Sequence, residues 1–258
     1  PLWTPSLPTA HYGHKYTGKR SDKKVVYFPS CINQTMGRSK RDNTGSDLVD
    51  EVVKLCGKAG WEVIFPKGMK NLCCGMIWES KGMPDIAERK VQELEAALCE
   101  ASQQGRYPVI CDQSPCMHRM KEHFKDIAPY ELMEFIHDFV APELDFVAID
   151  EPVALHITCS TRKMSLTDKI TELARMCSRN VLIPEGIGCC GFAGDKGFTH
   201  PEVNAYALRK LRQQIEEAGI KRGFSNSRTC EVGLSTNSGV PYMSLAYLID
   251  ECTTPKKS

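Results

Sequence analysis

Short apolar runs alternate with longer amphipathic stretches through most of the chain. Residues 25–28 and 153–157 are apolar runs with the length and composition of buried strands. In the stretches that follow them, residues 48–59 and 166–177, apolar side chains recur at helical spacing. Strands that alternate with helices in this way predict β-α-β units and a parallel sheet.

The same order of elements occurs twice, so the chain contains an internal repeat of roughly half its length. The first repeat contains the sequence CCGMIWESKGMPDI and the second contains CCGFAGDKGFTHPEV, and the two can be aligned almost residue by residue. Each sequence leads into a long predicted helix that starts near a proline, Pro84 or Pro201. Proline suits the first turn of a helix because the N–H that it lacks has no partner there.

These observations predict an α/β fold made of two Rossmann-like β-α-β repeats, whose parallel sheets are related by approximate twofold symmetry. We place the first repeat and a connector at residues 25–150 and the second repeat at 151–258. A helix is expected in the connector, from Tyr130 to Phe139. Residues 1–24 are polar, contain prolines and begin with Pro1, so we expect them to be a linker within a longer polypeptide.

Two matched sets of cysteines are the strongest chemical signal in the chain. The first set is Cys31, Cys73, Cys74 and Cys116, and the second, in the same order, is Cys159, Cys189, Cys190 and Cys230. Every member follows a predicted strand, and the carboxyl ends of parallel strands meet at one edge of a sheet, where ligands bind. We therefore expect each repeat to bring four thiols together.

Four thiolates complete a tetrahedral zinc site or hold a four-iron cluster. Iron–sulfur chemistry is favoured because adjacent ligands such as Cys73 and Cys74 suit a multi-iron body better than a single ion, and zinc is the alternative. A purely structural role as buried apolar residues is the other interpretation of these cysteines. Gly75 and Gly191 directly follow the two pairs, and we expect them to adopt a positive φ that lets the backbone pass close to a bound cluster.

Composition and charge narrow the classes of function. The formal net charge of +1 gives no reason to expect nucleic acid or an anionic membrane surface as a ligand, and no apolar run has the length of a transmembrane helix. Thirteen cysteines that include vicinal pairs favour metal-bound thiolates in a reducing compartment over a disulfide framework. The sequence has neither a dinucleotide fingerprint nor a P-loop, so this segment is not expected to bind FAD, nicotinamide or nucleotide itself.

The doubled pattern of a lone cysteine, a CCG turn and a later cysteine resembles the cysteine-rich CCG domain. This domain occurs in heterodisulfide reductase and in iron–sulfur proteins that serve the oxidation of glycolate, glycerol 3-phosphate and lactate. The second half, with CCGFAGDKGFTHPEV followed by FSNSRTCEVGLS, is similar to the C-terminal region of FAD-linked D-lactate dehydrogenases. The resemblance covers residues 25–252.

The resemblance implies iron–sulfur clusters of the 4Fe–4S type held by the eight set cysteines, and FAD bound by a preceding part of the same chain. Electrons from the oxidation of D-lactate or a related D-2-hydroxyacid would pass from FAD through the clusters toward a quinone or cytochrome. The partners would be flavin and ferredoxin-like domains of the same chain, with residues 1–24 following the ferredoxin-like segment. The module would be cytoplasmic or peripheral at the inner membrane face, and no residue in it would be catalytic by itself.

One position in each set departs from the family pattern. Gln113 and Ser227 occupy the place of the first cysteine in the family's CxxC, so each set has four cysteines rather than five. This puts in doubt a noncubane cluster that uses a fifth thiolate, unless Cys111 substitutes by a shift of its loop. Two other functions therefore stay open: a catalytic cluster module like that of heterodisulfide reductase, and a non-redox zinc-binding or scaffold module.

The remaining cysteines and the charged residues near the CCG turns have plainer interpretations. Cys56 and Cys177 lie on the apolar faces of corresponding predicted helices, and Cys252 continues another apolar stripe. Core packing is favoured over metal ligation for all three. Lys81 and Lys196 follow the two CCG turns and could tune a cluster, but solvated loops are the favoured interpretation.

Overall fold

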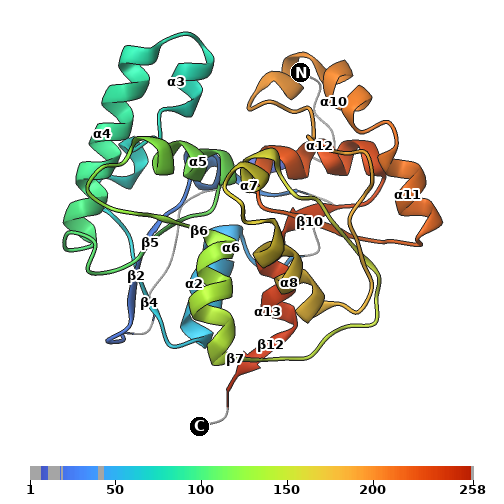
Figure 1. Ribbon diagram of the computed structural model, residues 1–258, viewed down its shortest axis with the longest axis horizontal. Coiled ribbons are helices and arrows are strands. Elements are labelled where there is room, and N and C mark those ends of the chain that lie inside the picture. The colour runs from blue at the N-terminus through green and yellow to red at the C-terminus, as the bar shows by residue number, and fades with distance from the viewer. Residues whose placement is uncertain (1–6, 11–17, 19, 40–43, 257–258) are drawn as a thin grey trace.

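Two four-stranded parallel sheets form the framework of the protein (Figure 1). The computed structural model describes residues 7–10, 18, 20–39 and 44–256. The strand order is β4-β2-β5-β6 in the first half and β9-β8-β10-β11 in the second, and all neighbouring strands are parallel. The strands are β2 (Lys24–Phe28), β4 (Glu62–Ile64), β5 (Val109–Cys111), β6 (Tyr130–Glu131), β8 (Val153–Leu155), β9 (Val181–Leu182), β10 (Gly223–Ser225) and β11 (Tyr242–Ser244). The predicted α/β fold with two similar repeats is confirmed.

Both sheets are covered on both faces, which explains why their strands are continuous apolar runs. In β2, Val25 and Tyr27 face one core while Val26 and Phe28 face another, and all four are at most 1% exposed. Strand β8 alternates between two cores in the same way. Because side chains alternate across a strand, burial of both faces requires apolar residues at every position.

The helices follow the strands in matching order in the two halves. In the first half they are α1 (Cys31–Thr35), α2 (Leu48–Lys58), α3 (Met76–Ser80), α4 (Pro84–Ala101), α5 (Ser114–His123) and α6 (Leu132–Phe135), with the 3-10 helix η1 (Met69–Asn71) before α3. In the second half they are α7 (Cys159–Lys163), α8 (Thr167–Cys177), α9 (Lys196–Thr199), α10 (Pro201–Ala207), α11 (Leu211–Glu217), α12 (Arg228–Ser238) and α13 (Leu245–Glu251). Pro84 and Pro201 open α4 and α10, as predicted.

Helices α2, α6, α8 and α13 lie between the two sheets and join the halves (Figure 1). Helix α13 of the second half packs on α2 of the first, and α6 of the first half packs on α8 of the second. After α6, the π-helical segment η2 (Ile136–Val140) and the 3-10 helix η3 (Ala141–Glu143) lead to β7 (Leu144–Phe146). Strand β7 pairs antiparallel with β12 (Thr253–Pro255), which follows α13. These reciprocal contacts are the ones that a pseudo-twofold axis produces.

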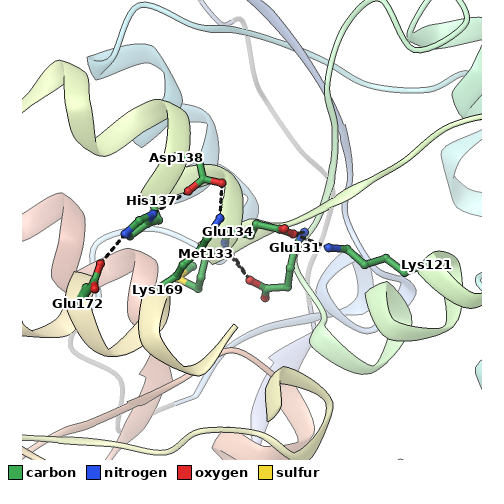
Figure 2. Close-up of polar contacts among 8 residues, drawn as sticks. All are labelled: Lys121, Glu131, Met133, Glu134, His137, Asp138, Lys169 and Glu172. Carbon is green, nitrogen blue, oxygen red and sulfur yellow. Dashed lines mark hydrogen bonds and ion pairs between the residues drawn. The ribbon is translucent and has the colours of Figure 1, made fainter. Parts of the chain in front are cut away.

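Polar contacts at the edge of this layer link η2 to α8. His137 bonds to Glu172 and Lys169 pairs with Asp138 (Figure 2), and the distance from Nε2 of His137 to the Glu172 carboxylate is 2.8 Å. Exposed ion pairs of this kind contribute about 0–1 kcal/mol each. The apolar core shared by the two halves therefore supplies most of the stability of the contact.

The connector contains a strand that the sequence pattern did not predict. Tyr130 and Glu131 form β6, whereas a helix was expected to begin at Tyr130. The Glu131 side chain accepts hydrogen bonds from the N–H groups of Met133 and Glu134, so it caps a helix that starts one residue later (Figure 2). The correction therefore comes from a capping carboxylate, which fixes Glu131 in an extended conformation.

The long helix predicted after Pro201 is interrupted. A turn at residues 208–210 separates α10 from α11, whereas α4 in the first half runs unbroken for 18 residues. At the turn, the N–H groups of Arg209 and Leu211 bond to carbonyls three residues earlier, a tighter pattern than that of an α-helix.

Most of the expected linker, residues 1–24, lies outside the described residues, and the boundaries of the two repeats stay predictions. Within the linker, Pro8–Ala10 forms β1, which pairs antiparallel with β3 (Met36–Ser39).

Candidate metal centres

The eight predicted ligands lie beyond the carboxyl ends of the strands. Cys31 and Cys159 begin α1 and α7, directly after β2 and β8. Cys116 and Cys230 lie in the first turns of α5 and α12, which follow β5 and β10. The two cysteine pairs lie in the loops after β4 and β9. Parallel strand pairing thus brings segments that are far apart in sequence to one edge of each sheet.

In the first set, the four thiols form a continuous chain of interactions. Cys31 interacts with Cys73, Cys73 with Cys74, and Cys74 with Cys116. Hydrogen bonds from Cys31 and Cys74, and one from the N–H of Gly75 at 3.4 Å, lower the pKa of Cys73 to about 2. The hydrogen bond to Cys73 in turn raises the pKa of Cys31, because it favours the protonated donor.

The second set repeats this arrangement. Its chain runs from Cys159 through Cys189 and Cys190 to Cys230, and the sulfurs of the last two lie 2.9 Å apart. Hydrogen bonds from Cys159 and Cys190, and from the N–H of Gly191 at 3.4 Å, lower the pKa of Cys189 to about 2. In each set the first cysteine of the CCG pair is therefore the thiol that loses its proton most readily, and the thiolate is the form of cysteine that binds metals.

Each set extends from the interior to the surface. The second cysteine of each pair and the lone cysteine after it are at most 9% exposed: Cys74, Cys116, Cys190 and Cys230. Cys31 and Cys159, at the other end of each chain of thiols, are exposed. A centre held by such a set would have one side in the core and one side open to a partner.

The glycines after the cysteine pairs have the predicted positive φ, +86° at Gly75 and +72° at Gly191. The close approach that they permit is to the proline-started helix of each repeat, α4 or α10. A Cβ on Gly75 would lie 2.4 Å from the carbonyl oxygen of Ala87 in α4, and one on Gly191 would lie 2.9 Å from the carbonyl oxygen of Val203 in α10. Both distances are too short for real contacts, so glycine is needed to seat each pair against its helix.

Two buried donors that the sequence patterns did not reveal hold the cysteine pairs in place. Nε of Arg119 donates to the carbonyl of Cys74 at 2.9 Å, and Nδ2 of Asn204 donates to the carbonyl of Cys190 at 2.6 Å. Arg119 and Asn204 are 3% and 4% exposed. The sequence carries no distinct signal for them, because the two repeats differ at most aligned positions of these helices.

The positions that replace the family's further cysteines meet between the halves. Nε2 of Gln113 donates to Oγ of Ser227 at 3.0 Å, and Oε1 of Gln113 accepts the N–H of Arg228 at 2.9 Å. Both side chains are at most 5% exposed. Gln113 and Ser227 are thus hydrogen-bonded across the interface between the repeats and do not join the thiols. This arrangement fits a set of four thiols in each repeat.

The five other cysteines are buried, and the core packing predicted for three of them is confirmed. Cys56, Cys177 and Cys252 are at most 3% exposed and belong to the core that the two halves share. Cys99 is 6% exposed in the outer core of the first half. Cys111 is fully buried at the end of β5, and burial raises the pKa of its thiol, which favours a packing role.

The loops after the two CCG turns meet each other. Nζ of Lys81 lies 2.8 Å from a carboxylate oxygen of Asp195, and both side chains are about half exposed, at 47% and 43%. Lys81 is therefore a solvated residue that forms a surface ion pair between the repeats. Exposed pairs of this kind contribute little stability.

The residues present fit an iron–sulfur cluster. The N–H groups of Gly75 and Gly191 point at cysteine sulfurs, and such hydrogen bonds tune clusters. His156 is 2% exposed, and its Nε2 has no hydrogen-bond partner within the described parts of the chain. Burial lowers the pKa of His156 to about 4, so its ring is neutral, while the charge of Cys189 acts on it. The unpaired Nε2 of His156 can therefore form a hydrogen bond with a group bound at the second cysteine set.

The spacing of the thiols does not by itself favour a cluster over a single ion. Among the residues that the structure describes, no group of three or more His, Cys, Asp or Glu side chains has the arrangement of an ion site. The sulfurs of Cys190 and Cys230 are 2.9 Å apart. A tetrahedral zinc ion with bonds of about 2.3 Å would separate its sulfurs by roughly 3.8 Å. The sulfurs must therefore move apart when any metal binds.

Comparisons with known proteins agree with these observations. The sequence profile of the cysteine-rich CCG domain matches residues 25–121 and 153–235. One of the subunits of the anaerobic glycerol-3-phosphate dehydrogenase of Escherichia coli (strain K12) is 26% identical over 234 residues, which make up 83% of this chain and 56% of that relative. The chain thus spans about half the length of that relative.

Two further relatives are lactate utilization proteins. Lactate utilization protein A of Oceanobacillus iheyensis is 23% identical over 212 residues, 75% of this chain and 81% of that protein. Lactate utilization protein A 1 of Bacillus mycoides is 22% identical over 240 residues, 84% of this chain and 92% of that protein. Among solved structures, an aspartate racemase of Picrophilus torridus matches 91% of this chain and 96% of its own with 12% identity and a TM-score of 0.40, a likeness too remote to bear on function.

Proposed function

Because the chain belongs to the family of cysteine-rich CCG domains, we propose that it is an iron–sulfur electron-transfer module of a dehydrogenase. The observation that carries the proposal is the pair of thiol chains, each assembled from separate segments at the carboxyl edge of its own parallel sheet. The names of the relatives, part of a glycerol-3-phosphate dehydrogenase and two lactate utilization proteins, support an oxidoreductase.

In this proposal the eight set cysteines are the ligands of two centres, one in each repeat. An iron–sulfur cluster supplies one-electron redox chemistry when it is bound. The buried members of each set, such as Cys74 and Cys190, keep water from one side of the centre. The exposed Cys31 and Cys159 leave the other side open to a partner domain. The N–H groups of the CCG glycines stabilise negative charge on the sulfurs.

The substrate that we propose for the whole enzyme is D-lactate or a related D-2-hydroxyacid. A flavin domain would oxidise it, and a quinone or cytochrome would receive the electrons. The similarity of residues 189–203 to FAD-linked D-lactate dehydrogenases supports this substrate class, as do the two lactate utilization relatives. Within the described ranges, no helix is both long enough and apolar enough to cross a membrane.

The contacts between the halves favour electron transfer over a catalytic cluster module. A catalytic cluster like that of heterodisulfide reductase would draw on a fifth thiolate, and Gln113 and Ser227 are instead bonded to each other between the halves. A zinc-binding scaffold stays the alternative, because four thiolates also complete a tetrahedral zinc site.

The test is metal analysis of protein purified and reconstituted anaerobically. Two four-iron centres predict a brown protein with about eight iron and eight sulfide per chain. Cys74→Ser and Cys190→Ser should each lose about half of the iron, whereas the core variant Cys56→Ser should keep all of it. Stoichiometric zinc in a colourless protein, or equal iron in all four proteins, would overturn the proposal.

A further inference from the structure

The two repeats hold their cysteine pairs with donors that come from different places. In the first repeat, Arg119 reaches from α5 to the carbonyl of Cys74. In the second repeat, Asn204 reaches from α10 to the carbonyl of Cys190. The two carbonyls are equivalent in the repeats, but the two donors are not.

Each donor is matched by a small residue in the other repeat. Counted from the lone cysteine three residues before it, Arg119 corresponds to Gly233. Counted from the proline that opens its helix, Asn204 corresponds to Ala87. Each repeat therefore has one donor and one small residue, in exchanged positions.

The space around the CCG turns explains the exchange. A Cβ on Gly233 would lie 2.6 Å from Nδ2 of Asn204 and 2.8 Å from Cδ2 of Phe192, so these two side chains occupy the room that a side chain at position 233 would need. In the first repeat, Nε of Arg119 lies 3.1 Å from the place of a Cβ on Gly75, and the neighbouring Ala87 is fully buried. Each CCG turn thus holds one donor side chain. Without that donor, the carbonyl of Cys74 or Cys190 would be a buried acceptor with no hydrogen bond.

The exchange changes the charge at the two sites. Arg119 places a guanidinium with 4% exposure beside the first set, and its partner Glu79 is 53% exposed. Asn204 is neutral and accepts a hydrogen bond from Asn237 at 2.6 Å. Arg162 donates to the carbonyl of Gly188 next to the second pair, but its side chain is exposed, so solvent screens its charge. A buried cation thus lies at the first cysteine pair and a buried neutral amide at the second.

We propose that Arg119 and Asn204 are interchangeable positioning residues for the two CCG turns, and that the charge of Arg119 raises the reduction potential of the first centre. The second half of this statement rests on the proposed function, because it requires a cluster at the first set. Reduction adds one electron, and therefore one negative charge, to the centre. A nearby buried cation stabilises that charge, and net charge is among the factors that set cluster potentials.

Two variants of the first repeat separate the donor from the charge. Arg119→Gly removes both, so it should lower the unfolding midpoint of the metal-free protein and the iron content of the reconstituted protein. The double variant Ala87→Asn/Arg119→Gly copies the second repeat, so it should recover both properties. At a fixed electrode potential, its first centre should be about tenfold less reduced than that of the wild type, which is about 59 mV for a one-electron couple.

The reciprocal variants and a charge control complete the test. Asn204→Ala/Gly233→Arg, combined with Phe192→Met to copy Met76 and clear position 233, should raise the potential of the second centre. Arg162→Gln should shift that centre by less than the loss of Arg119 shifts the first. If the double variant of the first repeat is as unstable without metal as Arg119→Gly alone, the donors are not interchangeable. If it is stable and its first centre keeps the wild-type potential, the charge of Arg119 has no role. Wild-type protein that binds no cluster would overturn the proposed function and the charge effect, while the unfolding midpoints would still decide the exchange of donors.

Discussion

Replacing Gly75 by alanine should destabilise the protein much more than the same change at Gly82, in the turn between α3 and α4. Both glycines have a positive φ, +86° and +74°, so both variants carry the strain of that conformation. They differ in the space around the added methyl group. A Cβ on Gly82 meets no atom within 4 Å, whereas one on Gly75 would lie 2.4 Å from the backbone oxygen of Ala87.

The magnitudes follow from these two observations. The left-handed conformation costs a non-glycine residue about 1–2 kcal/mol, which is the whole effect expected for Gly82→Ala. Overpacking adds about 1–3 kcal/mol when the neighbouring atoms cannot move away cheaply. The neighbour of Gly75 is backbone in the middle of a contact between a turn and a helix, so Gly75→Ala should cost about 2–5 kcal/mol in total. The clash with Ala87 is relieved only if α4 shifts away from the CCG turn. That shift would also disturb the hydrogen bond from Arg119 to the carbonyl of Cys74.

The assay is urea unfolding of the metal-free wild type and both variants, together with iron content after reconstitution. With a slope of about 2 kcal/mol per molar urea, the two variants should differ in midpoint by about 0.5–1.5 M. Gly75→Ala should also lose iron from the first centre, and Gly82→Ala should keep it. If the two variants unfold at the same urea concentration, close packing does not explain the glycine of the CCG turn.

Three further predictions concern buried and exposed groups away from the turns. Burial raises the pKa of Glu131 from 4.5 to about 7, so the folded protein binds a proton there that the unfolded chain has already lost. Stability should therefore fall by about 3 kcal/mol as the pH rises from about 4.5 to 7, and Glu131→Gln should lack this fall; parallel pH profiles in chemical unfolding would contradict the assignment. Cys56→Ser should cost about 1–3 kcal/mol through a buried hydroxyl, and a loss of iron in the same variant would show that our division into ligands and core residues is wrong. Lys81→Ala should change the unfolding free energy by less than about 1 kcal/mol, because its pair with Asp195 is half exposed, and a larger effect that persists in high salt would refute a screened surface pair.

Local patterns were enough to predict the framework of the fold and the members of the two cysteine sets. The strands are buried on both faces, so their apolar runs are visible in sequence, and the internal repeat identifies equivalent elements. The same reasoning missed β6 and β11, because they are not apolar runs and, unlike the equally short β9 and β10, do not lead to a set cysteine. It also misplaced the start of α6, which depends on whether the Glu131 side chain turns toward the backbone of the helix.

Only the tertiary structure decided which groups surround the sets. Arg119 and Cys74 are 45 residues apart, and Gln113 and Ser227 are 114 residues apart. Nothing in the local sequence distinguishes a buried arginine that supports a cysteine pair from one on the surface of an amphipathic helix. The difference arises when the small Ala87 leaves room beside the CCG turn and α5 packs close enough to fill it. Burial and hydrogen-bond partners are properties of packed elements, so the chemistry near each centre depends on contacts that no single segment encodes.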